Sequence, residues 1–405
     1  MRSGPFAPPF RLRRVLRQAP DDDKVRIVGK VLVPVTPDVL DWAIRESGFS
    51  RAEVARGAGV DEAQLERWLR EEEQPTLTAM RKVASKLHRQ LAVFLLPTPP
   101  KSQGVGVRFR HPIGSKHERA LTPDERRFLR RARRLQEAEA WLVSQLEWGY
   151  APLERVSIDD SAEDVAARWR SRMRITIRAQ KSWKTPSIGF ESWRSELERA
   201  GVTVVQFAMG PKGCRGFSIW DERAPLVAVN TAWPDEARIF TLFHEIGHLL
   251  TRTDSACATA PMVPQAGDPT ERWCEAFAAA VLIPSAALAQ VGKVETLSLL
   301  SRVAREMKVS LRAMALRLIS LRKASWPLYQ SIPPAADAKR RGGAGGTGRS
   351  RAEMRIDEFG RRATELFVAA VQRDVISESQ ALDVLDIPSG TFERIEAAAP
   401  VGCRP

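Results

Sequence analysis

The sequence is poor in cysteine and has no long apolar run, and each shortage excludes a class of protein. Its 405 residues include 4 cysteines, and no two of them form a C-x-x-C pair or a disulfide framework, which is typical of a reducing compartment. No apolar run approaches the ~20 residues of a membrane span, and the first residues lack the continuous apolar core of a secretory signal. We therefore expect a cytoplasmic protein with no membrane partner.

Acidic residues are also in short supply relative to basic ones. The chain has 63 Lys and Arg against 49 Asp and Glu, a formal net charge of +14. Such an excess favours a polyanionic partner such as nucleic acid, although an arginine-rich proteome would raise the charge equally well. The hydrophobic content of 43% is ordinary for a soluble globular chain, and the length predicts two to three domains.

Residues 31–97 are predicted to form a bundle of four short helices. Glycine at position 59 separates the second helix from the third, and two short helices joined by a glycine-containing turn are the helix-turn-helix pattern. The run SRAEVA at 50–55, followed by Gly59-Val60 and by Trp68, resembles the XRE-type (Cro/lambda-repressor) domain. The resemblance implies a DNA-binding module.

The charge of this bundle leaves its partner open. Between Arg51 and Pro75 there are four basic and seven acidic side chains, and DNA-binding proteins contact phosphates with Lys and Arg. Gln64 and Arg67 are the candidates for reading base edges. A protein-docking or dimerising role is an equally good interpretation of the bundle.

Residues 98–160 are expected to form a basic connector built on one long helix. That helix begins at Pro123 and is expected to continue to about Trp148, with closely spaced arginines in its first half. Basic charge beside aromatic rings suits single-stranded nucleic acid, because phosphates pair with the charges and bases stack on the rings. A solvated helix face is the alternative. The candidate nucleic-acid contacts are Arg127, Arg130, Arg131 and Arg134.

Residues 161–335 have the pattern of an α+β domain. Strands are expected near 202–207, 216–220 and 226–229, and the third directly precedes a helix that begins near Asp235. A strand at this point can lie beside a cleft at the helix and pair its backbone with an extended polypeptide.

The helix that follows carries a His-Glu-x-x-His motif at positions 244–248. Positions i and i+4 of a helix share a face, so His244 and His248 can bind one metal ion. Glu245 lies where its carboxylate can act as general base on a water at that metal. The motif predicts one zinc ion per chain and a hydrolase.

A third ligand is expected from a second helix that packs against the first. Glu271 is the best candidate, and Glu275, one turn further on, is expected to hydrogen-bond a ligand histidine. Spacing alone also allows the reverse assignment, with Glu275 as ligand and Glu271 as its support.

Four segments of this region resemble the ImmA/IrrE family of zinc metallopeptidases. They are RGFS at 215–218, PLVAVN at 225–230, FTLFHEIGHLL at 240–250 and ERWCEAFAAAVLIP at 271–284. The resemblance spans about 162–323 and implies a zincin-like fold and a gluzincin-like site, with His244, His248 and Glu271 as ligands and Glu245 as base. Family members usually carry Asn or Asp at the position of Glu275, so the longer side chain departs from the pattern.

The resemblance also implies a function. The family is associated with cleavage of helix-turn-helix repressors, which relieves repression during stress or mobile-element induction. We therefore expect an intracellular zinc endopeptidase that cleaves a transcriptional repressor or antitoxin-like protein. The alternative is a non-catalytic DNA-binding regulator or antitoxin that uses the helix-turn-helix bundle.

The whole chain is expected to be mostly α-helical with a small β-sheet. Residues 1–30 are expected to be disordered, and the glycine-rich stretch at 336–350 is expected to be a flexible linker. A carboxyl-terminal helical unit, with no recognisable chemistry, is predicted at 351–405.

Overall fold

A computed structural model describes most of the chain and confirms the α+β fold class. The described residues are 31–100, 108–109, 121–149, 152–253, 255–257, 268–333, 351–387, 390 and 392–398. They form mostly helices and one five-stranded mixed sheet. The segment expected to be disordered (1–30) and the expected linker (336–350) both lie outside the described residues. No helix in the described part is long and apolar enough to cross a bilayer.

The chain divides into two compact units. One contains residues up to Leu40 together with Arg51–Thr98, and the other contains Asp41–Ser50 together with everything from Pro99 onward. The connector, the metal-binding region and the carboxyl-terminal helices therefore lie in one unit. The domain boundaries given above stay predictions.

The amino-terminal helices form where their capping residues predict them. They are α1 (Pro37–Ser47), α2 (Arg51–Ala58), α3 (Glu62–Leu69), α4 (Leu77–Lys86) and the 3-10 helix η1 (Leu91–Leu95). Gly59, at φ +76°, turns the chain between α2 and α3 in a conformation that glycine adopts without strain. Asp61 then caps α3 by accepting the Gln64 amide at 2.7 Å. Leu65 and Trp68 of α3 are buried in the bundle.

The second unit is built around the sheet. Its strands are β1 (Arg108–Phe109), β2 (Thr203–Phe207), β3 (Gly216–Ile219), β4 (Leu226–Asn230) and β5 (Ser255–Cys257). They lie in the order β1-β5-β3-β4-β2, with β3 antiparallel to both neighbours and the other two pairings parallel. Its helices are α5 (Pro123–Gln145), α6 (Ala162–Arg172), α7 (Ile177–Ser182), α8 (Pro186–Arg199), α9 (Asp235–Thr251), α10 (Pro269–Leu282), α11 (Leu297–Met307), α12 (Leu311–Ser320), α13 (Trp326–Gln330), α14 (Arg351–Phe359), α15 (Arg361–Gln372), α16 (Glu378–Leu385) and α17 (Phe392–Ala398).

The position of β4 corrects one expectation. The sequence allowed the strand before the metal helix to lie beside the cleft, but in the structure this strand lies inside the sheet. All five of its residues pair with β2, and four also pair with β3 on the other side. Backbone groups that already bond within the sheet are not available to a substrate. Any strand that pairs with a substrate must be another one.

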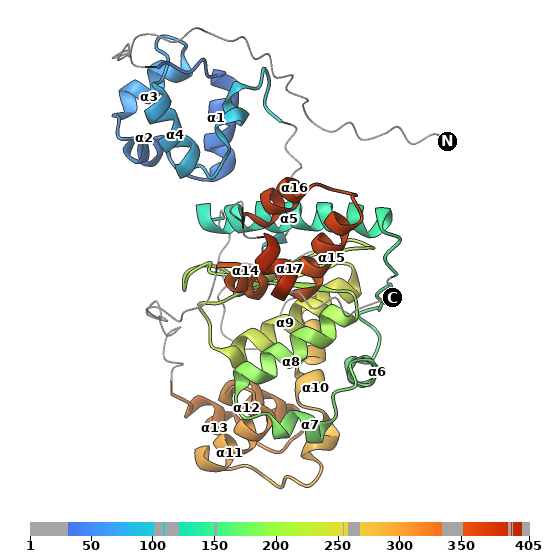
Figure 1. The fold of residues 1–405 in the computed structure, drawn as a ribbon. Helices are drawn as coiled ribbons and strands as arrows, with labels where there is room; N and C mark the ends of the chain where they lie inside the picture. Colours follow the sequence, from blue (N-terminus) through green and yellow to red (C-terminus); the bar gives the residue numbers. More distant parts are fainter. Residues whose placement is uncertain are drawn as a thin grey trace. The chain divides into compact units, whose positions relative to one another are not determined.

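Alternating side chains divide the core of the second unit into two layers. Val227 and Val229 of β4 face the layer formed with α8, α9 and α10, whereas Leu226 and Ala228 face the layer formed with α5 and the carboxyl-terminal helices. Figure 1 shows α5 and α14–α17 on one side of the sheet and α8–α10 on the other. The metal helix therefore lies against one face of the sheet, buried between it and further helices.

The carboxyl-terminal helices are an integral part of the second layer. Phe359 and Phe367 are fully buried in the same apolar cluster as Phe207 of β2 and Phe128 of α5. Burial of such side chains contributes roughly 1.5–3 kcal/mol each. One face of the sheet is thus covered by residues that lie about 150 positions after β2 in the sequence.

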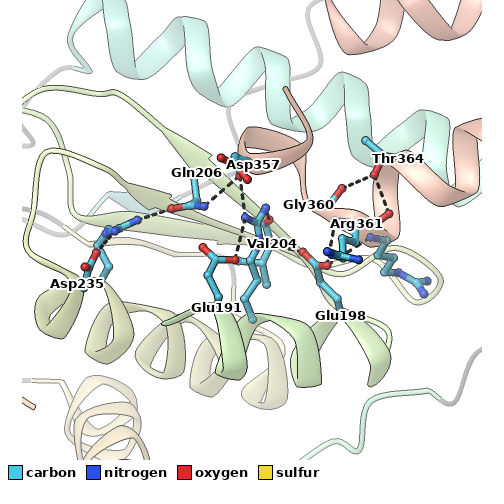
Figure 2. Close-up of polar contacts among 12 residues, drawn as sticks. Glu191, Glu198, Val204, Gln206, Asp235, Asp357, Gly360, Arg361 and Thr364 are labelled. Carbon is cyan, nitrogen blue, oxygen red and sulfur yellow. Dashed lines mark hydrogen bonds and ion pairs between the residues drawn. The ribbon is translucent and has the colours of Figure 1, made fainter. Parts of the chain in front are cut away.

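A buried polar seam joins these helices to β2 and α8 (Figure 2). Arg194 of α8 bonds Glu198 at 2.9 Å and donates to the carbonyl oxygens of Val204 and Asp357. The Glu198 carboxylate in turn accepts the backbone N–H groups of Arg361 and Arg362. The N-cap residue of α15 is a glycine, which has no side chain to accept these N–H groups. Glu198 therefore does the work of an N-cap side chain for α15.

Candidate metal centre

Helix α9 carries the His-Glu-x-x-His motif on a fully buried surface. His244, Glu245 and His248 are each at most 5% exposed, and the apolar residues between and around them are buried as well. A helix that is apolar all round requires a cover on every side. The sheet supplies one cover, and α8 and α10 supply the others.

Close packing of α10 on α9 brings the third carboxylate to the histidines. A Cβ added to Gly247 would lie 2.9 Å from Cys274 Sγ and 3.1 Å from Cys274 Cα, so only glycine fits at this crossing. Asp268 caps the start of α10 by accepting the Thr270 amide at 2.9 Å. Glu271 therefore lies in the first turn of α10, buried and directed at the histidines.

The three side chains converge with the spacing of metal ligands. Glu271 Oε2 lies 3.1 Å from His244 Nε2, Glu271 Oε1 lies 3.4 Å from His248 Nε2, and the two Nε2 atoms are 3.1 Å apart. Two ligand atoms about 2.0–2.1 Å from one zinc ion at a tetrahedral angle lie roughly 3.3 Å apart. The donor set and its spacing therefore fit a zinc ion.

The electrostatics of Glu271 suit a metal ligand. Burial raises the pKa of its carboxyl group, but hydrogen bonds and charge from His244 and His248 outweigh burial and hold the pKa well below its usual range. The carboxylate is thus ionised at neutral pH, the form in which it binds a cation.

Thr253 orients one of the two histidines, a role that sequence analysis missed. Its hydroxyl lies 2.9 Å from His248 Nδ1, and its backbone N–H donates to the His248 carbonyl. A proton on Nδ1 directed at this hydroxyl leaves Nε2 free for the metal. In the sequence, the signal for this role was the threonine just beyond the end of the helix. The expected contact of Glu275 with a histidine stays a prediction, and its side chain is partly exposed.

Strand β3 passes directly beside Glu245. A Cβ added to Gly216 would lie 2.6 Å from Thr241 Cγ2 and 2.7 Å from the Ala228 carbonyl oxygen, and 3.6 Å from Glu245 Cγ. A glycine at this position lets the strand approach the helix at backbone distance. The strand next to the candidate general base is therefore β3.

The two candidate base-reading residues of the amino-terminal bundle meet at one carboxylate. Gln64 Nε2 donates to Glu73 at 2.9 Å and Arg67 Nε donates to it at 3.0 Å. These hydrogen bonds lower the pKa of Glu73, and the bond from Gln64 has the largest effect. Both side chains are thus already bonded within the bundle, and their nucleic-acid role stays a prediction.

The arginines of α5 have partners that the sequence did not indicate. Arg131 forms an ion pair with Glu358 and stacks at 4.7 Å on the Phe359 ring, with its side chain only 13% exposed. Arg134 pairs with Asp383. Arg127 and Arg130 of the same helix are partly exposed. Two of the four candidate nucleic-acid contacts are thus engaged by the carboxyl-terminal helices.

An α+β unit with a buried two-histidine, one-glutamate cluster on this motif defines a metallopeptidase. Residues 197–319 match the family model described as the IrrE N-terminal-like domain, Peptidase_M78. The match includes β2–β4, α9 and α10, and it supports the sequence resemblance over the central part of the chain. No curated protein matches the chain significantly. The amino-terminal bundle lies outside the match, so its XRE-type assignment stays a prediction.

Proposed function

We propose that this protein is a zinc-dependent endopeptidase. The observation that carries the proposal is the buried cluster of His244, His248 and Glu271, whose donor atoms lie within 4.8 Å of one another, next to Glu245. A structural zinc site is usually closed by four protein ligands, whereas a catalytic site uses three and leaves one position for water or substrate. The cluster found among the described residues has three.

When bound, zinc supplies a Lewis acid for the scissile carbonyl and acidifies water to a pKa of about 7. Glu245 accepts a proton from the attacking water and delivers it to the amine that leaves. Its carboxyl group is fully buried on the helix that carries both histidines, so its position relative to them is held by the helix itself. Thr253 holds the His248 ring in one orientation through Nδ1.

We further propose that the substrate is a helix-turn-helix repressor or an antitoxin-like protein, and that cleavage relieves repression inside the cell. The family resemblance supports this substrate class. The acidic balance of the amino-terminal bundle, with four basic and seven acidic side chains between Arg51 and Pro75, supports a protein-docking role for it. The alternative, a non-catalytic DNA-binding regulator, is favoured by the net charge of +14.

The test is co-expression with the repressor encoded nearby, followed by cleavage with purified proteins. Wild-type protein is expected to cleave the repressor, and Glu245→Gln is expected to retain zinc and fold but lose cleavage, because an amide cannot serve as base. Glu236→Gln, about two and a half turns earlier on the same helix, is the matched control and should cleave normally. Cleavage by Glu245→Gln at the wild-type rate would show that the mechanism is wrong.

A further inference from the structure

Strand β3, next to the candidate metal centre, has a neighbouring strand on both of its sides. At one end of the sheet, β2 packs against α14, and Gln206 of β2 donates to the Asp357 carbonyl at 3.0 Å. Towards the other end, β5 pairs with the side of β3 that faces away from β4. Strand β5 is itself paired with β1. In the described part of the chain, the sheet thus offers no unpaired edge next to Glu245.

The side of β3 taken by β5 is the edge that an extended substrate would need. Glu245 Cγ lies 3.6 Å from a Cβ built on Gly216, and β4 occupies the opposite side of β3. An extended polypeptide binds a sheet by adding a strand through main-chain hydrogen bonds. To bring a scissile bond close to Glu245 in this way, the polypeptide must pair with residues 216–218. These are the residues that pair with β5.

From this arrangement, and on the basis of the proposed peptidase function, we infer that β5 is an autoinhibitory strand. It lies antiparallel to β3 over three residue pairs, Gly216 with Cys257, Phe217 with Ala256 and Ser218 with Ser255. An extended substrate and β5 compete for the same backbone groups. The protein therefore exists in a closed state, in which β5 is paired, and an open state that admits substrate.

The link between β5 and the metal helix makes this competition effective. Helix α9 ends at Thr251, Arg252 follows in a left-handed conformation at φ 60°, and Thr253 bonds His248. Because β5 begins only two residues later, it is a tethered competitor, and short tethers give effective concentrations on the order of millimolar. A pairing of three residues is nevertheless short, and such local structure opens at a small fraction of the global unfolding free energy.

A reversible cross-link between the two strands tests the inference. Ser218 and Ser255 are partners across β3 and β5, and paired residues of antiparallel strands lie close enough for a disulfide when the geometry of the pair is suitable. The double variant Ser218→Cys, Ser255→Cys is made in the full chain, with Cys257→Ser and Cys403→Ser to prevent exchange and Glu245→Gln to prevent turnover. Formation of the disulfide is checked by mass spectrometry and zinc content by elemental analysis.

The probe is fluorescein-labelled β-casein, an extended polypeptide, and its binding is measured by fluorescence anisotropy. Affinity is expected to fall at least tenfold on oxidation and to return on reduction, at unchanged zinc content. The two single-cysteine variants, which cannot form the cross-link, should show no response to reduction. Three results would overturn the inference: equal affinity in both redox states, no binding in the reduced state, or no disulfide after oxidation.

A second measurement separates this inference from the peptidase proposal. The same cysteine pair is placed in a chain that retains Glu245, and casein cleavage is followed in both redox states. Cleavage only in the reduced state supports both. Redox-dependent binding without any cleavage would support the inference that β5 is autoinhibitory and would reject peptidase activity on this probe. Equal cleavage in both states would reject the autoinhibitory strand alone.

Discussion

At the scale of single residues, the candidate metal centre depends on small side chains as much as on the three residues that would bind the metal. Gly247 allows α10 to approach α9, and Gly216 allows β3 to approach Glu245. A methyl group at either glycine would overlap neighbouring atoms, two of which belong to the backbone. Overlap of this kind in a packed core typically costs about 1–3 kcal/mol. The spacing of the donor atoms is therefore set by packing around the motif as well as by the motif.

The first prediction concerns the ligand set. His248→Ala and Glu271→Ala are expected to lose most bound zinc, because each removes one of three donor atoms, whereas Glu275→Ala should keep close to one zinc per chain. Elemental analysis of protein purified in excess zinc provides the measurement. Retention of zinc in Glu271→Ala together with its loss in Glu275→Ala would reverse the assignment of the two glutamates.

Thr253 is expected to tune the site without binding the metal. Thr253→Val removes the hydroxyl bonded to His248 Nδ1 at nearly constant volume, and loss of such a partner typically lowers metal affinity by 10–100-fold. Thr253→Ser keeps the hydroxyl and serves as the control. Competition with a fluorescent zinc chelator measures the affinity. Equal affinities for the valine and serine variants would mean that the hydroxyl has no role in orienting His248.

At the scale of elements, a buried carboxyl group lies where α5 meets the sheet. Glu139 of α5 is 1% exposed and accepts a hydrogen bond from the Thr203 hydroxyl of β2 at 2.6 Å. Burial raises its pKa to about 7, although Thr203 and Arg362 of α15 act in the opposite direction. The packing of α5 against β2 and α15 therefore favours a protonated Glu139.

This burial predicts a pH dependence of stability. The pKa of Glu139 is about 7 in the fold and lower in the unfolded chain. At pH values between these two pKa values, Glu139 is protonated in the folded protein and ionised in the unfolded chain. Its contribution to stability is present at low pH and is lost as pH rises through 7. The loss is on the order of 3 kcal/mol, since one pKa unit corresponds to 1.36 kcal/mol.

Urea unfolding of wild-type protein and Glu139→Gln between pH 5 and pH 8 measures this effect. The glutamine variant should gain stability relative to wild type as pH rises, because an amide cannot ionise. Glu137→Gln, an exposed position on the same helix, should follow the wild type. A constant difference between Glu139→Gln and wild type across the range would contradict the prediction.

At the scale of the whole molecule, the candidate nucleic-acid residues do not form one basic stripe that is open to solvent. The amino-terminal bundle engages its two candidate base readers with Glu73. Helix α5 engages Arg131 and Arg134 with Glu358 and Asp383 of the carboxyl-terminal helices. Three of the candidate arginines, Arg67, Arg131 and Arg134, are thus paired with carboxylates of the same chain, and affinity for a polyanion is expected to be modest.

Any DNA binding is therefore predicted to be weakly sequence-selective and to fall steeply with salt, as phosphate contacts require. Arg127→Glu with Arg130→Glu should weaken it more than Gln64→Ala with Arg67→Ala. Arg131→Glu and Arg134→Glu are left out of this comparison, because they would also break contacts with the carboxyl-terminal helices. Mobility shifts on single-stranded and duplex DNA across a salt series decide the point. Tight, salt-tolerant, sequence-specific binding that depends on Gln64 and Arg67 would instead identify the bundle as an operator reader.

Local features were readable from the sequence because their causes are local. Helical spacing places His244 and His248 on one face whatever surrounds them, and a capping residue followed by proline marks the start of α5 at Pro123. Short, strand-like apolar runs indicated β2 and β4 within one residue of their observed ends. The motif, the helices and the α+β class followed from such short-range rules.

Only the tertiary structure decided which distant groups meet. Packing at Gly247 brings Glu271 to the histidines, pairing on both sides places β4 inside the sheet, and docking of the carboxyl-terminal helices buries Arg131. Strand β5 pairs with β3, which lies almost forty residues earlier in the chain. These outcomes depend on the combined packing of many side chains across the core, and no short window of sequence contains that information.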